Sequence, residues 1–360
     1  MRLVNTKSIK IETRLGQTIY NDNGQTLLQK GIKLSERMIN RLINQGITYV
    51  YIEEQETSDI QVESTISEEL RLEATNTIKE AFHDMKKNGF MEQSHILNKN
   101  GRKLSDIVHR IMEEIQGNEN SLSLLSDIFV TDNYIFQHSL NVTIYSLAIG
   151  LELNLTERQL TEIGTGAMLH DIGKIFIDQE ILQKPDKLTD EEFEVIQSHT
   201  ELGFNFLRKH IDIPSVIAHC AYQHHERLDG TGYPRGIKGD DIHMYAKLIG
   251  VADVFDAVTS NRVYRDALLP HEGLEILYAG AVSLFEKDMV TAFKNSVAVY
   301  PEGLTVELSD KRVGVVTRQN KYLCDRPFIR IIEEKDQRIQ SPYEVDLASV
   351  VNVTITNCIS

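Results

Sequence analysis

The chain has 360 residues and carries 38 lysines and arginines against 53 aspartates and glutamates, a formal net charge of −15. This length predicts two or three domains, and the charge argues against a protein held to a nucleic acid polymer by a basic surface. Three scattered cysteines, no secretory signal and no apolar stretch long enough to span a bilayer predict a cytoplasmic protein without a membrane segment.

Residues 1–60 have the pattern of a small α+β module. Apolar and polar side chains alternate there in the manner of short strands, and the dipeptide Asn23-Gly24 favours a tight hairpin turn. Apolar residues recur at helical spacing between 34 and 43, and Ser35 is placed to begin that helix.

The rest of the chain divides into three predicted segments. Residues 61–125 come after an acidic linker and contain two amphipathic helices. These helices form either a helical hairpin or a connector through which two copies pair as a homodimer. Helical periodicity dominates 126–295, broken by a glycine-rich stretch at 230–239, and 296–360 holds short β runs divided by turn residues. The predicted fold is mainly α, a helical bundle with an N-terminal α+β module and a small C-terminal β barrel or sheet.

The unusual feature of the composition is its twelve histidines, seven of which lie between 138 and 225. The adjacent His170 and Asp171 alone mean little, because a buried histidine with ordinary hydrogen bonds is far more common than a metal ligand. Segments with helical periodicity also present His138, His199, His224, His225 and Asp253. Imidazole nitrogen with carboxylate oxygen suits divalent iron, manganese, zinc or magnesium, and these residues are too many for one closed tetrahedral zinc.

Two ions together suit the cleavage of a phosphodiester, which needs an activated water and relief of charge on the phosphoryl oxygens. Asp171 is the candidate bridge, because its neighbour His170 can serve one ion while the carboxylate reaches both. Lys174 has only donors to offer, so we expect it to bind the substrate phosphate or the developing negative charge. Asp171 and Lys174 are the predicted catalytic residues.

Five motifs follow one another in the order HSLNV, LHDIGK, SHTELG, HHERLDGTGYP and ADVFDAVTSNRVYR. Over residues 131–270 this set resembles the signature of the HD-GYP family of cyclic di-GMP phosphodiesterases. The resemblance implies a helical HD-domain bundle, a centre of two or three metal ions and hydrolysis of cyclic di-GMP. The metal ligands that it implies are His138, His170, Asp171, His199, His224, His225 and Asp253. The substrate-binding residues that it implies are Lys174 and Arg265 for phosphate, and the loop of Asp229, Gly230, Gly232, Tyr233 and Pro234.

Three positions depart from the family pattern. Tyr134 stands where some members carry a glutamate that helps to hold a third ion, and a phenol is a poor ligand at neutral pH because its pKa is about 10. We therefore expect two divalent ions, iron or manganese, and by the resemblance the linear dinucleotide pGpG as the main product, with GMP left open. Thr200 and Val263 replace prolines that are common in the family, and neither change removes a ligand.

The loop also has an interpretation of its own. Gly230 and Gly232 permit close backbone approach, and Pro234 biases Tyr233 toward an extended conformation. The ring of Tyr233 is then expected to serve either as a stacking surface for guanine or as packing against the floor of the site.

Two other functions stay open from the sequence. One is a sensor that binds a cyclic dinucleotide with little catalysis, although no predicted ligand is missing here. The other is a phosphohydrolase that acts on another nucleotide, because an HD centre by itself is indifferent to the base. Around the ligands, His219 is expected to pack or to lie behind them, while Glu226 and Asp256 either orient imidazoles or face solvent. The acidic run at 190–194 is expected to be a solvated face.

Overall fold

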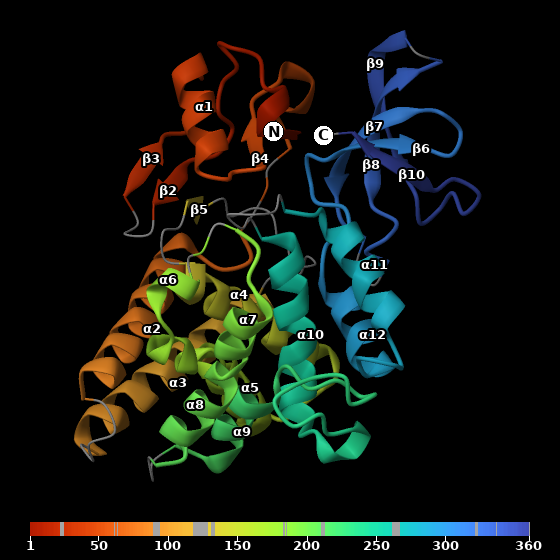
Figure 1. Cartoon of the computed structure of the whole chain (residues 1–360). Coiled ribbons are helices and arrows are strands. Elements are labelled where there is room, and N and C mark those ends of the chain that lie inside the picture. Colours follow the sequence, from red (N-terminus) through yellow and green to blue (C-terminus); the bar gives the residue numbers. More distant parts are fainter. Residues whose placement is uncertain are drawn as a thin grey trace.

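The computed structural model shows a helical body with two smaller parts that contain strands at one end of it (Figure 1). The structure describes all residues except 22–24, 61, 63, 89–93, 118–128, 131–133, 183, 185, 210–212, 261–266, 321–322, 336 and 360.

The helical body runs from residue 68 to residue 296. Its α-helices are α2 (Glu68–Asn88), α3 (Ser94–Gly117), α4 (Tyr134–Glu152), α5 (Glu157–Leu169), α6 (Gln179–Leu182), α7 (Asp190–Gln197), α8 (His199–Leu207), α9 (Ser215–Gln223), α10 (Met244–Thr259), α11 (Pro270–Gly280) and α12 (Lys287–Ser296). Two 3-10 segments, η3 (Ile172–Phe176) and η4 (Gly239–Asp241), lie in the connections. The predicted break at 230–239 is confirmed as a stretch without a helix until η4 begins.

The helices α4 and α10 lie at the centre of the body. Nearly every position from Leu140 to Ile149 and from Leu248 to Asp253 is buried, as expected of helices that are apolar on all sides. α4 packs against α2, α5, α10 and α12. This arrangement puts His138 of α4 and Asp253 of α10 in the middle of the body.

The starts of α5 and α7 are fixed by local sequence. Thr156 before α5 and Thr189 before α7 each form a capping box, with Gln159 and Glu192 respectively. Such reciprocal hydrogen bonds satisfy backbone N–H groups that the first turn of a helix leaves free. The start of α5 is therefore defined, and its C-terminal end carries His170.

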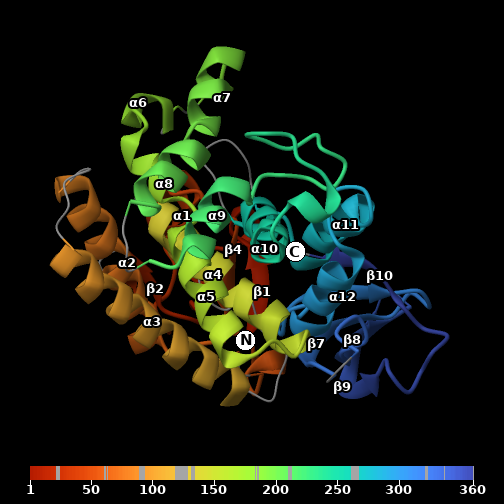
Figure 2. The same cartoon turned by 90° about the horizontal axis from the view of Figure 1, so that it is seen from below.

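The helices α2 and α3 lie side by side along one flank of the body (Figure 2). Their apolar positions are buried, among them Leu70, Ile78, Phe82 and Leu104, and they belong to the same core as α4 and α5. The apolar face expected for this segment is thus covered within one chain. The domain boundaries at 60, 125 and 295, and the pairing of two copies through this connector, stay predictions.

The N-terminal part is the predicted α+β module. Its strands are β1 (Arg2–Asn5), β2 (Ile19–Asn21), β3 (Thr26–Leu28) and β4 (Tyr49–Ile52), with α1 (Glu36–Asn44) and the short η1 (Thr6–Ser8) and η2 (Gln55–Thr57). β1 pairs with β4, and β2 pairs with β3 as the expected hairpin, although Asn23 and Gly24 lie outside the described residues. Ser35 begins α1 as predicted, because its side chain accepts from the N–H of Met38. β5 (Phe129–Val130), which was not predicted, pairs in parallel with β2.

The C-terminal part is a five-stranded antiparallel sheet in the order β10-β6-β7-β8-β9. Its strands are β6 (Thr305–Leu308), β7 (Val313–Arg318), β8 (Phe328–Glu334), β9 (Gln337–Asp346) and β10 (Ile355–Ile359). The sheet shares an apolar core with the N-terminal module, in which Leu3 and Tyr51 pack with Leu269, Leu304 and Val306. In Figure 1 both ends of the chain lie on the same side of the helical body, among the strands of these two parts.

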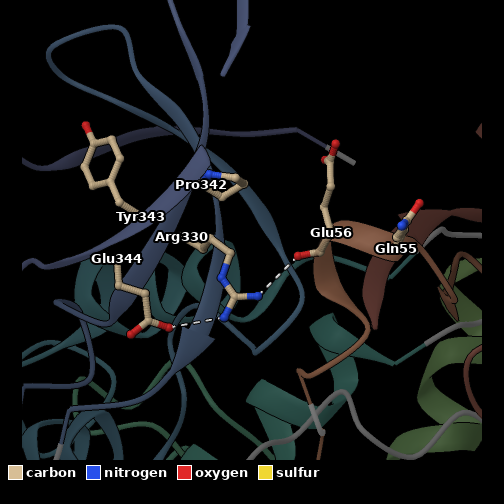
Figure 3. A pocket seen from close by; sticks show the side chains of 6 residues that line it. All are labelled: Gln55, Glu56, Arg330, Pro342, Tyr343 and Glu344. Atoms are coloured by element: carbon tan, nitrogen blue, oxygen red, sulfur yellow. Dashed lines mark hydrogen bonds and ion pairs between the residues drawn. The ribbon is translucent and has the colours of Figure 1, made fainter. Parts of the chain in front are cut away.

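A pocket lies between η2 and the strands β8 and β9 (Figure 3). Its lining residues are Gln55, Glu56, Arg330, Pro342, Tyr343 and Glu344. The guanidinium of Arg330 donates to both carboxylate oxygens of Asp59, at 2.6 and 2.7 Å, and lies 3.5 Å from Glu344. Because Arg330 is already paired with carboxylates, this pocket offers no strong site for an anion.

The predicted fold class is confirmed: the protein is mainly α-helical, with an α+β module before the bundle and a small sheet after it. Among the described helices, none is both long and apolar enough to cross a lipid bilayer.

Candidate metal centre

Six elements carry the predicted ligands to one place inside the body. His138 lies in the first turns of α4, His170 ends α5 and Asp171 begins η3. His199 is the first residue of α8. The remaining three are His224 at the end of α9, His225 directly after it, and Asp253 in α10. All of these side chains except that of His225 are buried, and His225 is only 17% exposed.

Asp171 lies among four of the histidines, and its Oδ1 is 3.9 Å from Nε2 of His224. Its Oδ1 is 3.3 Å from Nε2 of His199, and its Oδ2 is 3.4 Å from Nε2 of His170 and 3.6 Å from Nε2 of His138. The ammonium of Lys174 lies 2.5 Å from the same Oδ2. One carboxylate thus faces imidazoles from α4, α5, α8 and the end of α9, and its bridging role stays a prediction.

Asp253 occupies the other side of the centre. Its Oδ1 is 3.1 Å from Nε2 of His138, and its Oδ2 is 3.5 Å from Nδ1 of His225. Within the described part of the chain, two groups of three side chains bring their ligand atoms within 4.8 Å of one another: His199, His224 and His225 form one, and His138, His170 and Asp171 form the other. Each group could hold a metal ion, and the number of ions stays a prediction.

Backbone carbonyls fix the orientation of three imidazoles. Nδ1 of His170 lies 2.6 Å from the carbonyl of Ala167, Nδ1 of His199 lies 2.6 Å from that of Ile196, and Nδ1 of His224 lies 3.0 Å from that of Ala221. A carbonyl only accepts, so each Nδ1 donates and each Nε2 keeps its lone pair free for a ligand. Such contacts behind the ligand are typical of metal-binding histidines.

Two buried polar atoms without hydrogen-bond partners among the described residues are independent support for a metal ion at this place. Nε2 of His170 and Oδ1 of Asp171 are buried, and neither makes a hydrogen bond with any residue that the structure describes. A buried polar atom without a partner costs free energy, and a bound cation would satisfy both. The donor set of imidazole and carboxylate without thiolate suits a divalent ion of the first transition row.

Burial and charge set the protonation states that a ligand needs. Burial lowers the pKa of His199 to about 4 and holds the pKa values of His224 and His225 well below the usual value, so all three are neutral at pH 7. Burial alone would raise the pKa of Asp171, but Lys174 and His170 outweigh it, and that pKa lies well below its usual range.

His138 differs from the other histidines because carboxylates face both of its nitrogens. Burial lowers its pKa, but hydrogen bonds to Asp253 and Asp256 outweigh this effect and raise the pKa to about 9. In the absence of metal the ring therefore carries a proton, which a metal ion at Nε2 would displace.

The structure decides the roles of two residues that the sequence left open. Asp256 is fully buried, and its Oδ2 lies 2.7 Å from Nδ1 of His138, so it orients that ring. Glu226 is also buried and accepts hydrogen bonds from the backbone N–H groups of Arg235 and Ile237. Glu226 therefore holds the loop rather than a ligand, and neither residue faces solvent.

The glycine-rich loop closes over the rim of the centre. A Cβ on Gly232 would lie 2.4 Å from the nitrogen of Arg227 and from the carbonyl of His225, so only glycine fits there. Tyr233 stacks on His225 and is followed by a cis peptide bond to Pro234. Asp229 accepts from the N–H and hydroxyl of Thr231 and so stabilises the turn itself.

Some predicted residues stand apart from this cluster. Arg265 lies outside the described residues, as does the side chain of Tyr134. His219 packs its ring against Phe204, in agreement with a packing role. The structure brings the predicted ligands together. The role of each one as a ligand, and the substrate contacts, stay predictions.

Sequence reasoning missed Phe193 of α7. Its ring meets that of Tyr233 edge to face, with centroids 6.3 Å apart, yet 47% of the residue is exposed to solvent. It was overlooked because it stands in the acidic run at 190–194, which was expected to be only a solvated face. An exposed aromatic ring beside a site would have been the signal.

Comparison with known proteins places this geometry in a family. A model of the HD domain matches residues 104–288. The chain belongs to the HD domain family. A cyclic di-GMP phosphodiesterase of Pseudomonas aeruginosa is 32% identical over 241 residues, which are 67% of this chain and 58% of that protein. A cyclic di-GMP phosphodiesterase of Thermotoga maritima is 34% identical over 62% of this chain and 61% of that protein. The HD-GYP resemblance of the motifs is confirmed at the level of the family.

Other relatives of this HD domain protein carry different names. A 3'3'-cGAMP-specific phosphodiesterase of Vibrio cholerae is 34% identical over 48% of this chain and 37% of that protein. A solved HDG"Y"P protein from Bdellovibrio bacteriovorus aligns with a TM-score of 0.47 at 17% identity, over 81% of this chain and 97% of that one. The chain spans 58% and 61% of the length of the two cyclic di-GMP phosphodiesterases described above.

Proposed function

We propose that this protein is a metal-dependent phosphodiesterase that hydrolyses cyclic di-GMP. The observation that carries the proposal is the double ligand group around Asp171, with Lys174 beside it and the loop of Tyr233 at the rim. The names of the two relatives above support the substrate. By the HD-GYP resemblance, the main product is pGpG.

The cofactor in this proposal is a pair of divalent ions, iron or manganese. The residues that would hold them are His138, His170, Asp171, His199, His224, His225 and Asp253. When bound, the ions supply Lewis acidity, which lowers the pKa of a water molecule and neutralises negative charge on the phosphoryl oxygens.

The chain's own residues prepare the site for this chemistry. The neutral histidines and the ionised Asp171 offer lone pairs, not protons, toward the centre. Lys174 is 18% exposed and holds its ammonium at the edge of the centre, where it can donate to a phosphoryl oxygen while Asp171 keeps it in place. The burial of the ligands excludes bulk water, which strengthens each of these interactions.

The substrate contacts follow from the rim. Tyr233 and Phe193 offer aromatic surface for a guanine base, and stacking on such rings does not depend on the identity of the base. Asp229, Gly230, Gly232 and Pro234 shape the loop, while Arg265 stays a predicted phosphate contact. The negative charge of the chain is no obstacle, because a small dinucleotide is held by cations inside one pocket.

We also infer a cytoplasmic location for the protein. Cys220, Cys324 and Cys358 are all free thiols in the structure. Free cysteines, two of them buried, are typical of a reducing compartment.

A second candidate substrate is 3'3'-cGAMP, which is favoured by the relative from Vibrio cholerae that is named for it. The two cyclic dinucleotides share their phosphodiester linkages and differ in one base. Stacking on Tyr233 and Phe193 would accept either base, so the choice between them depends on contacts at the base edge.

The test is to incubate anaerobically purified, metal-loaded protein with cyclic di-GMP and to separate the products by chromatography. We expect pGpG to form, and to form faster than the linear product of 3'3'-cGAMP. No turnover of either substrate with iron or manganese would overturn the proposed reaction. Tight binding without cleavage would instead identify a sensor, and faster turnover of 3'3'-cGAMP would correct the substrate.

A further inference from the structure

A chain of hydrogen bonds leads away from the metal centre behind His138. Nδ1 of His138 lies 2.7 Å from Oδ2 of Asp256, and Asp256 is fully buried. The other oxygen of this carboxylate accepts from the side-chain amide of Asn141 at 2.8 Å and from the hydroxyl of Ser260 at 3.0 Å. The orientation of the His138 ring therefore depends on groups that hold Asp256.

The side chain of Asn141 can donate a hydrogen bond to Asp256 in only one orientation of its amide. The NH₂ group must face the carboxylate, since the amide oxygen there would set lone pair against lone pair. The amide oxygen of Asn141 accepts instead from Nη1 of Arg71 at 3.4 Å and from Nε2 of Gln137 at 3.1 Å. A glutamine amide can itself turn over, whereas a guanidinium has only donors. Arg71 is thus the group that makes the orientation of Asn141 unambiguous.

Arg71 comes from outside the matched HD domain. It lies in α2, while the family match begins at residue 104 in α3. The residue is only 5% exposed, which is rare for an arginine and indicates a specific internal role. Its neighbour Thr75 donates back to the carbonyl of Arg71, so that turn of α2 is well fixed.

We propose that Arg71 is a positioning residue for the metal centre, acting through Asn141 and Asp256 on the ring of His138. The inference rests on the metal centre proposed above and adds to it a contribution from the helix that precedes the HD domain. Loss of Arg71 lets the Asn141 amide turn over, removes the hydrogen bond to Asp256 and frees the His138 ring to rotate away from the centre.

The test measures the Kd of Mn²⁺ for the full chain by titration calorimetry, with unfolding of the metal-free protein followed by circular dichroism. Arg71→Met removes the donors and keeps an apolar stem. The matched control is Arg110→Met, because Arg110 joins α3 to α2 through Glu73 at 2.6 Å on the surface of the same helix pair. We expect R71M to raise the Kd about 10-fold, the lower end for a contact behind a ligand, and R110M to leave it unchanged.

Asn141→Ala tests the route through which Arg71 acts. We expect N141A to raise the Kd by about 10-fold or more, and the double variant R71M/N141A to bind no more weakly than N141A alone. Binding by R71M as tight as by R110M overturns the positioning role. If R71M does not fold, wild-type affinity in N141A overturns it. Failure of the wild-type chain to bind Mn²⁺ would overturn the metal centre itself, a separate result.

Discussion

The ring of Tyr233 stacks on the ring of His225, with centroids 4.6 Å apart and planes inclined by 29°. Tyr233 also meets Phe193 of α7 edge to face, and Phe193 in turn is half exposed. Aromatic surface therefore runs from a predicted metal ligand to the outside of the molecule. A nucleobase that follows this surface would bring its phosphodiester toward the centre.

Phe193→Ala is expected to raise the KM for cyclic di-GMP with little change in kcat, because the contact proposed for its ring is with the base and not with the reacting phosphate. Stacking on an aromatic side chain contributes about 1–3 kcal/mol per base, so the increase should be roughly 5-fold or more. Steady-state kinetics measure both constants. Val195→Ala on the same helix, where Val195 is also exposed, is the control, and an equal effect of both variants would remove Phe193 from the substrate site.

Asp171→Ala is expected to release metal and abolish hydrolysis while the helical fold persists. The carboxylate faces four imidazoles and belongs to one of the two ligand groups. Elemental analysis of anaerobically purified protein gives the number of ions per chain, and circular dichroism reports the fold. A variant that keeps full activity would show that the centre is wrongly assigned.

Lys174→Ala is expected to keep the metal ions and to lower kcat by roughly 10² to 10³, the loss typical of one donor that stabilises developing charge. Lys184→Ala is the control, because Lys184 lies nearby in sequence but pairs with Glu192. Turnover and metal content are measured on the same samples. Loss of metal in K174A would instead mean that Lys174 serves chiefly to keep Asp171 in place.

The metal-free protein is expected to lose stability as the pH falls below 6.5. Burial lowers the pKa of His199 to about 4. Between pH 6.5 and pH 4 this histidine is therefore protonated in the unfolded chain and neutral in the folded chain. His138 has a pKa of about 9 in the folded chain, so it stays protonated there, while the unfolded chain takes up this proton only near pH 6.5. Its contribution therefore opposes that of His199, by about 1 kcal/mol between pH 7 and pH 5. From His199 alone the free energy of unfolding should drop by about 2 kcal/mol between pH 7 and pH 5.

Urea unfolding of the protein with chelator at the two pH values checks this expectation. Bound metal should steepen the dependence near neutral pH, because a metal ion would displace the proton that His138 carries in the folded metal-free chain. A metal-free protein that is equally stable at pH 7 and pH 5 would contradict the burial of neutral histidines at the centre.

The sequence was sufficient to predict which residues meet at the centre. Each predicted ligand stands in or at the end of a helical segment, and the order of the motifs, through the family resemblance, identifies the set. The environment of charged neighbours was not predictable, since Asp256 and Glu226 have the same kind of flanking sequence as surface residues. Only packing of α4 against α10 buries Asp256 beside His138.

Sequence periodicity also could not predict pairings between distant segments, because they depend on how the elements pack. The pairing of β5 with β2 joins residues about a hundred positions apart, and nothing in a two-residue strand indicates its partner. The contact of Arg71 with Asn141 is likewise between two helices whose order in space the pattern does not give.

The core shared by the N-terminal module and the C-terminal sheet joins the two ends of the chain mechanically. Leu269, which opens α11, packs in that core with Leu3 and Tyr51. The N–H of Ala267 also donates to the hydroxyl of Thr48 in the module, at 3.4 Å. Residues 267–269 are therefore tethered to both terminal parts, and a force that pulls those parts apart would be transmitted to the start of α11.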